Sequence, residues 1–362
     1  MKRKAKRVFA FGLLMTMTLC AGCSGGEKKT SEIIESSVKE SSIQSVVEES
    51  KVSEVSEEST THFFNPLTGL EMDEKLLNTK PVAIMMNNIE YAQPLMGISK
   101  ADIAYECLVE GGITRIVAVY KDVASVGTIG SIRSARPPFI ELARGLDALY
   151  VYCGTSTQAN KLLKQDVLDH FDVAYYSDMA WRDSDRVAAG YAVEHTLITD
   201  GKKLSSLAES YGVDMTTEST YTQKFGTDSQ CLQGKDANEI IAKFSSYKTT
   251  TFKYNKDTKK YTVEQFGEAQ YDDTYDCKNT VENVLILNVN SYLIDDEHIN
   301  LDLVGSGSGY YFTQGKYISI KWSKADSDSP LIYTDESGAA LIMTAGRQYV
   351  CCVPLNNIPT IS

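Results

Sequence analysis

The chain has 362 residues, of which 43% are hydrophobic and 23% charged, and its formal net charge is −12. This length exceeds what one hydrophobic core usually holds, so more than one domain is expected. The acidic balance argues against nucleic acid as a partner, because nucleic-acid phosphates require cationic protein surfaces.

The N-terminus has the pattern of a bacterial lipoprotein signal peptide. Five basic residues within the first seven precede an apolar run over residues 8–19, which ends on Cys20-Ala21-Gly22-Cys23. A dozen or so apolar residues are too few to span roughly 30 Å of hydrocarbon as a helix. Small residues directly before a cysteine resemble a lipobox, although Cys20 stands where Leu is usual, and an ordinary secretory signal peptide is the alternative. We therefore expect removal of residues 1–22 and acylation of Cys23, which would anchor the protein on the extracytoplasmic face of the cell membrane.

The segment after the signal peptide, residues 23–61, is rich in Ser and Glu and lacks aromatic side chains. It holds too little apolar surface to offset chain entropy, so a disordered linker is predicted. Loss of the five basic residues with the signal peptide changes the net charge from −12 to −17. Such an acidic chain is not attracted to anionic lipid, so the acyl chains would hold it at the membrane.

Two domains are predicted for the rest of the chain. Residues 62–213 alternate between strand-like and helix-like patterns, whereas residues 237–362 have the pattern of strands and turns almost throughout. The polar, Thr-rich segment 214–236 is a candidate joint. We therefore predict a mixed fold (α+β or α/β), with an N-terminal α/β domain and a smaller, mostly-β C-terminal domain. The predicted strands are 82–86, 103–109, 113–120, 148–152, 251–254, 261–266, 284–289, 317–322, 331–333 and 349–353, and the predicted helices are 139–144, 156–164 and 204–211.

The cysteines and histidines give no metal-site pattern. Six cysteines follow Cys23, none in a C-x-x-C pair, and the whole chain has only four histidines. We therefore expect no metal and no cofactor, since Walker and dinucleotide-binding motifs are missing as well. Disulfides are permitted outside the cytoplasm, and Cys231–Cys277 is the one pairing considered. Cys107 and Cys153 lie in apolar strand-like runs and are expected to be buried thiols.

One hairpin carries a charged pattern. Gly111 and Gly112 predict a two-residue turn, which would set Arg115 diagonal to both Glu106 and Glu110 on one face. The two carboxylates would then lie about 13 Å apart along the strand. Paired glycosidase carboxylates need about 5–9.5 Å, so this pattern argues against an acid–base pair. A salt-bridged cluster that fixes the hairpin is the structural alternative to a ligand site.

The next charged pattern is the segment 130–138. Ser134 is a candidate helix N-cap, and the two prolines that follow are tolerated in a first helical turn. Arg133 and Arg136 would then lie at the positive end of a helix dipole, where cations are disfavoured. An anion is expected to complete the site, either a ligand phosphate or carboxylate or an internal Asp or Glu.

Three further places are candidate binding residues. Asn87 and Asn88 end an apolar strand, where ligand-facing groups often lie in α/β sheets. Trp181 with Arg182 offers a stacking platform beside charge, and His195 beside Glu194 could act as a base. Each has a structural alternative: a strand-ending turn, a surface patch and a structural histidine.

Several motifs resemble those of a known family. Residues 65–70, 100–103, 110–115 and 131–137, with the later glycine-rich run 305–309 and the strand that ends at Trp322, are similar to the YerB-type lipoproteins of Gram-positive bacteria. The resemblance covers nearly all of the chain after the linker. It implies a lipid-anchored, two-domain protein of a family labelled as of unknown function, and it supplies no catalytic residues. Relatives tend to have Asp-Asn where this chain has Asn87-Asn88.

These patterns favour a binding or accessory module for an anionic or glycan component of the envelope, with a cell-wall polymer or an envelope protein as partner. The alternative is a hydrolase or transferase of envelope polymers. The sequence shows no nucleophile–base pair, no metal-binding cluster and no closely spaced carboxylates, and this favours binding over catalysis. The candidate ligand residues are Arg133, Arg136, Arg115, Glu106, Glu110, Asn87, Asn88, Trp181, Arg182 and His195, and the enzyme alternative would use Glu106, Glu110, Arg133, Arg136 and His195.

Overall fold

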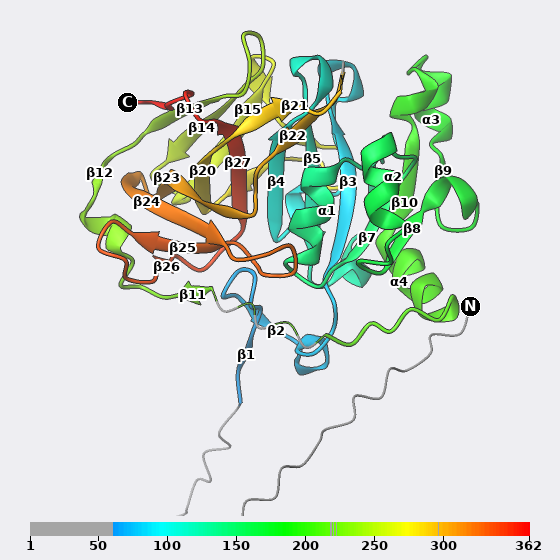
Figure 1. The fold of residues 1–362 in the computed structure, drawn as a ribbon, viewed down its shortest axis with the longest axis horizontal. Coiled ribbons are helices and arrows are strands. Elements are labelled where there is room, and N and C mark those ends of the chain that lie inside the picture. Colours follow the sequence, from blue (N-terminus) through cyan, green and yellow to red (C-terminus); the bar gives the residue numbers. More distant parts are fainter. Residues whose placement is uncertain (1–60, 218, 220, 222, 296) are drawn as a thin grey trace, which may run out of the picture. The chain divides into compact units, whose positions relative to one another are not determined.

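A mixed sheet of eleven strands runs through both halves of the described sequence and forms the centre of the fold (Figure 1). Ten of its strands follow one another in space, and β25 (Ile332–Asp335) pairs with β24. Their order is β12 (Lys235–Asp236), β24 (Lys316–Lys324), β23 (Gly305–Thr313), β20 (Asn283–Val289), β27 (Gln348–Pro354), β4 (Ile103–Leu108), β5 (Thr114–Tyr120), β3 (Val82–Asn88), β7 (Leu149–Tyr152) and β8 (His170–Asp172).

The computed structural model describes residues 61–362 except 218, 220, 222 and 296. The predicted signal peptide, Cys23 and the Ser/Glu-rich linker up to residue 60 lie outside the described residues. Residues Ser59–Ser362 form one compact unit. Its buried hydrophobic side chains give this unit a core of its own.

The strand β27 joins the two halves of the sequence. It pairs in parallel with β4 from the N-terminal half and with β20 from the C-terminal half. The segments 62–213 and 237–362, predicted as separate domains, thus share one hydrogen-bonded sheet, and their boundaries stay predictions. The mixed α/β character that the sequence predicts is confirmed.

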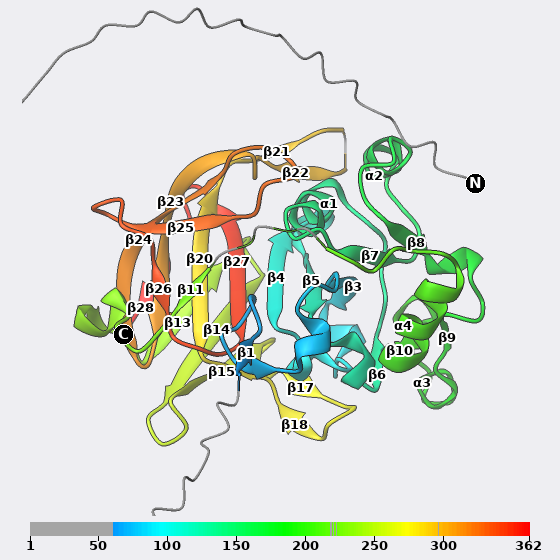
Figure 2. The same ribbon diagram turned by 90° about the horizontal axis from the view of Figure 1, so that it is seen from below.

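Both faces of the sheet are covered, which is why β3 and β5 are buried along their whole length and consist largely of apolar residues. One face carries α1 (Pro137–Arg144) and α2 (Thr157–Leu163), and the other carries α4 (Gly201–Ser210) and a second sheet (Figure 2). That second sheet consists of β16 (Glu268–Ala269), β15 (Lys260–Gln265), β14 (Thr249–Asn255), β13 (Glu239–Lys243), β28 (Thr360–Ile361) and β19 (Thr280–Val281).

Short elements complete the described chain. A three-stranded sheet, four strand pairs and the helix α3 (Ser184–Ala188) lie outside the two main sheets. These strands are β6 (Thr128–Gly130), β10 (Leu197–Asp200) and β9 (Trp181–Arg182), then β1 (Phe63–Phe64) with β2 (Glu71–Met72), β11 (Lys224–Phe225) with β26 (Ile342–Met343), β17 (Tyr271–Asp272) with β18 (Cys277–Lys278), and β21 (Ser291–Leu293) with β22 (Ile299–Leu301). The 3-10 turns are η1 (Glu74–Leu76), η2 (Glu90–Ala92), η3 (Ile98–Lys100), η4 (Glu110–Gly112), η5 (Val123–Ser125), η6 (Val173–Tyr175), η7 (Val193–His195) and η8 (Gln230–Gln233).

The considered disulfide is not formed. All six cysteines of the described chain are free thiols, and Cys231 is buried with its Sγ 3.4 Å from the carbonyl oxygen of Tyr311. Cys277 lies half-buried in β18. The Cys231–Cys277 pairing, which the sequence left open, is therefore not present in the described chain. Within the described residues, no helix is long and apolar enough to cross a membrane, and no group of three or more His, Cys, Asp or Glu side chains is placed to hold a metal ion.

Candidate functional site

The loop between β4 and β5 decides which charged side chains share a face. The backbone N–H of Val109 donates to the carbonyl of Ile113, so the loop has three residues, η4 (Glu110–Gly112), in place of the predicted two. The resulting register sets Cys107 opposite Arg115. A shift of one residue moves a side chain to the other face of a sheet. The prediction that Glu106 and Arg115 share a face is therefore wrong.

Glu106 lies on the face that packs against the second sheet, and it is fully buried. Lys248, 3% exposed, places its Nζ 3.4 Å from Glu106 Oε1. Burial lowers the pKa of Lys248, and the charge of Glu106 opposes that effect. Hydrogen bonds of 2.7–2.8 Å reach the two Glu106 oxygens from Asn88, Thr114, Thr250 and Tyr349. Glu106 and Asn88 thus form a buried polar network between the two sheets.

A cluster of arginines lies on the opposite face, around Glu110. Arg136 donates from Nε to Glu110 Oε2 at 2.9 Å and from Nη2 to Oε1, and Arg115 Nη2 donates to Oε1 at 2.8 Å. The side chains of Arg115 and Arg136 are 5% and 9% exposed, and that of Glu110 is 25% exposed. The anion expected beside Arg136 is therefore an internal carboxylate. We call Arg115, Arg133, Arg136 and Glu110 the guanidinium cluster.

The pKa values of this cluster follow from burial and charge. Burial raises the pKa of Glu110, but the hydrogen bond from Arg136 and the charges of Arg115 and Arg136 outweigh it and lower the pKa to about 2. Burial and the charge of Arg136 lower the pKa of Arg115 to about 10, against the effect of Glu110. Glu110 and Arg115 are therefore both charged at neutral pH.

The start of α1 offers no backbone donor to an anion. Its N-cap is Arg136, and the prediction of Ser134 as the cap is wrong, because the helix begins two residues later than that cap requires. Pro137 and Pro138 have no N–H, and the N–H of Phe139 donates to the carbonyl of Arg136. Anion binding beside this helix would depend on guanidinium groups.

Arg133 is the arginine of the cluster with the fewest hydrogen-bond acceptors around it in the described chain. Its Nη1 donates to the carbonyl of Glu194 at 3.1 Å, and its Nε is buried without a hydrogen-bond partner among the described residues. Burial lowers its pKa, Glu194 opposes that effect, and the charge of Arg136 adds to it. The Glu194 carboxylate is fully exposed and makes no ion pair within 4 Å with Arg133 in the described chain. Arg133 therefore keeps unused donors.

Asn87 and His195 lie beside the cluster at the end of β3. Asn87 is paired with Arg115 in the sheet, and its Nδ2 donates to His195 Nδ1 at 2.9 Å, which leaves the ring proton on Nε2. Burial and the charge of Arg133 lower the pKa of His195, so the ring is neutral at pH 7. The backbone N–H of Arg133 donates to the carbonyl of Met85, which brings Arg133 to the same strand.

Tyr150 is a further residue beside the cluster, and it is not among the candidates that the sequence indicates. It lies on β7, parallel to β3, and its hydroxyl is buried without a partner among the described residues. Burial raises its pKa, and the charges of Arg115 and Arg136 partly oppose that effect, so the hydroxyl lies in the field of the cluster. Residues alternate between the two faces of a strand, so the sequence 148–152 predicts Tyr150 and Tyr152 on the same face. This alternation is the one feature of the sequence that could have indicated Tyr150.

Trp181 and Arg182 do not form one platform. Neighbouring residues of a strand point to opposite sides, and in β9 the indole of Trp181 lies 4.9 Å below the Nζ of Lys203. Arg182 donates to the carbonyl of Val193, in the same turn η7 that Arg133 contacts. Arg182 thus lies next to the guanidinium cluster, and Trp181 faces away from it.

The structure gathers six of the ten candidate residues at the carboxyl end of β3, where ligands bind in many α/β sheets. These are Arg115, Arg133, Arg136, Glu110, Asn87 and His195. Glu106 and Asn88 lie on the other face of the sheet. The five residues named for an enzyme therefore do not share one cleft.

Comparison with known proteins places the chain in a family. Residues 67–214 match the family model described as "Protein of unknown function (DUF3048) N-terminal domain", and residues 240–350 match the corresponding C-terminal domain. The chain belongs to the DUF3048 family. It is 29% identical over 305 residues to the protein named "Putative lipoprotein YerB" of Bacillus subtilis (strain 168), covering 82% of this chain and 88% of that protein.

The crystal structure of YerB from Bacillus subtilis is similar to this fold, with a TM-score of 0.74 and 27% sequence identity. The likeness covers 83% of this chain and 99% of that chain. The resemblance to YerB-type lipoproteins that the sequence motifs indicate is thereby confirmed. The family description names no activity, so the role of the site rests on its own chemistry.

Proposed function

We propose that the protein is a lipid-anchored, extracytoplasmic binding module that holds an anionic group of an envelope component on Arg133. The predicted acylation of Cys23 and the lipoprotein name of the Bacillus subtilis relative support the anchor. The binding role is supported by hydrogen-bond donors of the guanidinium cluster that have no acceptor in the described chain. One observation carries it: Arg133 is a half-buried cation with a single carbonyl acceptor and a buried Nε without a partner in the described chain.

Charge counting favours an external anion. Arg115 and Arg136 share the one carboxylate of Glu110, which leaves the three guanidinium groups with an excess of positive charge. A guanidinium presents five N–H donors in a planar fork that fits phosphate or carboxylate oxygens. The Nη1 bond of Arg133 to Glu194 lies at the exposed side of the guanidinium, so an anion that reaches this side gains charge-assisted hydrogen bonds.

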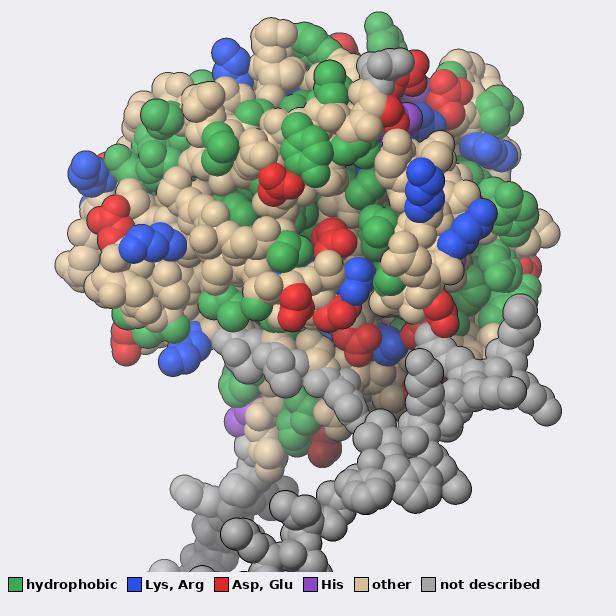
Figure 3. Space-filling model, viewed as in Figure 1, with side chains coloured by type: hydrophobic (Ala, Val, Ile, Leu, Met, Phe, Trp, Pro, Cys, Tyr) green, Lys and Arg blue, Asp and Glu red, His purple; other side chains and the backbone are tan. Residues whose placement is uncertain are grey.

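The surroundings fit an envelope polymer better than nucleic acid. Figure 3 shows acidic and basic side chains interspersed over the face that carries α1 and α2, in keeping with a chain of net charge −12. A nucleic-acid site needs an extended cationic surface. A single anionic group presented on a polymer, a phosphodiester or a carboxylate, matches the one half-buried guanidinium of Arg133 in an acidic protein.

Binding is favoured over catalysis by the position of Glu106. The hydrolase or transferase alternative requires Glu106 in one cleft with Glu110 and His195. Both carboxylate oxygens of Glu106 accept hydrogen bonds in the network between the sheets, and Glu106 lies on the face of the sheet opposite Glu110. The remaining Glu110 is held ionised by two arginines, which makes it a poor proton donor.

Thermal-shift measurements on residues 59–362 test this function. The probes are glycerol phosphate oligomers, glucuronate oligomers and neutral chitin oligosaccharides. Binding to Arg133 predicts stabilisation by one of the anionic polymers and a much smaller effect of the neutral one. Arg133→Gln should remove the stabilisation, whereas Arg144→Gln, at the far end of α1 and paired with the exposed Asp328, should keep it. Equal stabilisation of wild type and Arg133→Gln by the anionic probe would refute the proposal.

A further inference from the structure

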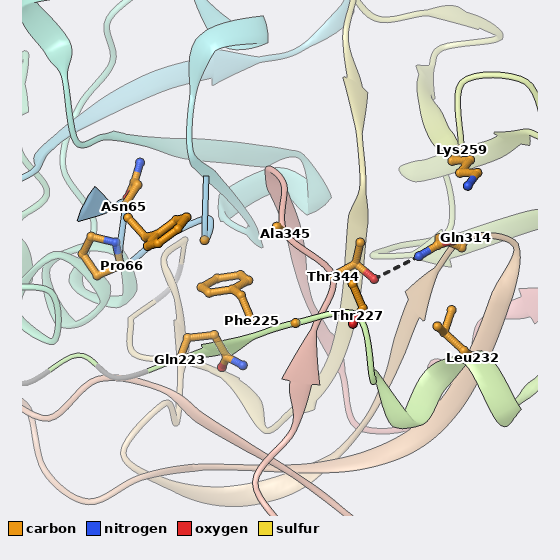
Figure 4. A pocket seen from close by; sticks show the side chains of 13 residues that line it. Asn65, Pro66, Gln223, Phe225, Thr227, Leu232, Lys259, Gln314, Thr344 and Ala345 are labelled. Carbon is orange, nitrogen blue, oxygen red and sulfur yellow. Dashed lines mark hydrogen bonds between the residues drawn. The ribbon is translucent and has the colours of Figure 1, made fainter. Parts of the chain in front are cut away.

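A second candidate site is a cavity of about 750 Å³ at the side of the molecule where β1, β11 and the turn between β23 and β24 meet (Figure 4). None of the guanidinium cluster residues lines it. Its volume lies within the range of pockets that hold small ligands. Its two ends differ in chemistry, which indicates the kind of molecule that it fits.

One end of the cavity is apolar. Figure 4 shows Pro66 and Phe225 together on this side, and Phe64 also lines the cavity with 57% of its surface exposed. The Phe225 ring rests on the backbone of Gly69, where an added Cβ would lie 2.4 Å from Phe225 Cβ. Because Gly69 has no side chain, the aromatic ring can lie flat against the hairpin loop. This end therefore presents fixed apolar surface that a ligand would remove from water.

The other end is polar and cationic. Figure 4 shows Lys259 and Gln314 across the cavity from Phe225, with Thr344 hydrogen-bonded to Gln314 Nε2 at 3.4 Å. Lys259 lies in the turn between β14 and β15 and makes no ion pair within the described residues. No Asp or Glu is among the described residues that line the cavity, although the chain has 48 acidic residues. Among the described residues that line the cavity, the one charged side chain is therefore the cation Lys259.

We propose that this cavity binds an amphiphilic anion: an alkyl chain or ring system that carries one carboxylate or phosphate. The apolar body would lie on Phe225, Pro66 and Phe64, and the anionic group would meet Lys259 beside Gln314 and Thr344. A cation without an ion-pair partner favours an anionic ligand over its analogues. A neutral analogue lacks the attraction to the cation, and a cationic analogue is repelled by it. The site is independent of Arg133 and adds a second ligand class to the protein.

The test compares decanoate, decanol and decyltrimethylammonium by displacement of the fluorescent anion 8-anilinonaphthalene-1-sulfonate from residues 59–362. Wild type should bind decanoate at least about tenfold more tightly than decanol, and the cation most weakly. Lys259→Gln should reduce decanoate affinity to the level of decanol and leave decanol unchanged. Phe225→Ala should weaken both. Lys256→Gln, in the same turn but outside the cavity lining, is the matched control and should change neither.

Three results would overturn the proposal. One is equal affinity of wild type for decanoate and decanol, and another is unchanged decanoate binding in Lys259→Gln. The third is no displacement of the fluorescent anion by decanoate below its micelle concentration. Arg133→Gln should leave decanoate binding intact, so a failure here is distinct from a failure of the proposed anion site on Arg133.

Discussion

At the scale of single residues, two arginines three positions apart have different roles. Arg136 is 9% exposed and is held by both oxygens of Glu110, whereas Arg133 has one backbone carbonyl as its partner. The sequence predicted an anion beside this pair and left open whether it is internal or a ligand. Glu110 is the anion that pairs with Arg136, whereas no carboxylate of the described chain pairs with Arg133.

Replacement of each arginine by glutamine separates these roles. Arg136→Gln should lower the free energy of unfolding by about 2–3 kcal/mol, less than the roughly 3–5 kcal/mol for breaking a fully buried pair, because Arg115 still neutralises Glu110. Arg133→Gln should change it by less than about 1 kcal/mol, as for other half-exposed charges. Urea unfolding of both variants measures this. Equal losses would contradict the assignment of Glu110 to Arg136.

The ionisation of Glu110 makes a pH-dependent contribution to stability. Its pKa is lowered to about 2 in the folded protein, so its stabilising effect is complete above the unfolded pKa near 4.5 and is lost as the pH falls toward 2. The difference in unfolding free energy between wild type and Glu110→Gln should therefore shrink by about 2 kcal/mol from pH 5 to pH 3. A difference that does not vary with pH would show that Glu110 is not held ionised by the arginines.

At the scale of elements, apolar patterns predicted many of the longer strands and helices, though not β23 (Gly305–Thr313) with its glycine-rich start, and they did not predict how the strands pair. The runs of Val, Ile and Met in β3 and β5, and the i, i+3 and i+4 spacing in α1 and α4, fall within the predicted ranges. The β4–β5 register was wrong by one residue, because a Gly-Gly loop is compatible with either two or three residues. The bond from Val109 to Ile113 decides between them, and with it the face of Glu106.

The network around Glu106 connects the two large sheets, and breaking it should be costly. Glu106→Ala leaves Lys248 buried without its carboxylate, so the free energy of unfolding should fall by about 3–5 kcal/mol. Glu264→Ala breaks a more exposed pair with Lys253 in the second sheet and should cost less than about 1 kcal/mol. Chemical unfolding of both variants provides the comparison. A Glu106→Ala protein as stable as Glu264→Ala would mean that the network does not stabilise the contact between the sheets.

At the scale of the whole molecule, the central sheet depends on strands far apart in sequence. β27 lies between β4 and β20, although more than 200 residues separate β4 from β27. Local periodicity contains no information about such a pairing, so the sequence predicted two successive domains. The shared sheet is visible only in the folded chain.

The shared sheet predicts how fragments behave after cleavage. Limited proteolysis within the segment 214–236 of residues 59–362 should give two pieces that still elute together, because β27 remains hydrogen-bonded to β4 and β20. Size-exclusion chromatography before and after addition of urea measures this. Separation of the two pieces in native buffer would show that the halves are held together mainly by the joint.

Anchoring remains a prediction that concerns residues outside the described part. Cys23 should carry acyl chains, and Cys23→Ala should release the protein from the membrane fraction or leave it with an uncleaved signal peptide. Mass spectrometry of the N-terminal peptide from membrane-purified protein checks this. An unmodified Cys23 in that material would rule out the lipid anchor.

Anion binding on Arg133 can be observed through the arginine Nε–H signals in two-dimensional ¹H–¹⁵N spectra of residues 59–362. The signals of Arg133 and Arg136 are assigned through their loss in the Gln variants, and the anionic oligomer that stabilises the protein is then added. Binding on Arg133 predicts a shift of its Nε–H signal, which lacks a hydrogen-bond partner in the described chain, while Arg136, bonded to Glu110, stays nearly unchanged. An unmoved Arg133 signal at saturating oligomer would show that the anion does not bind on Arg133.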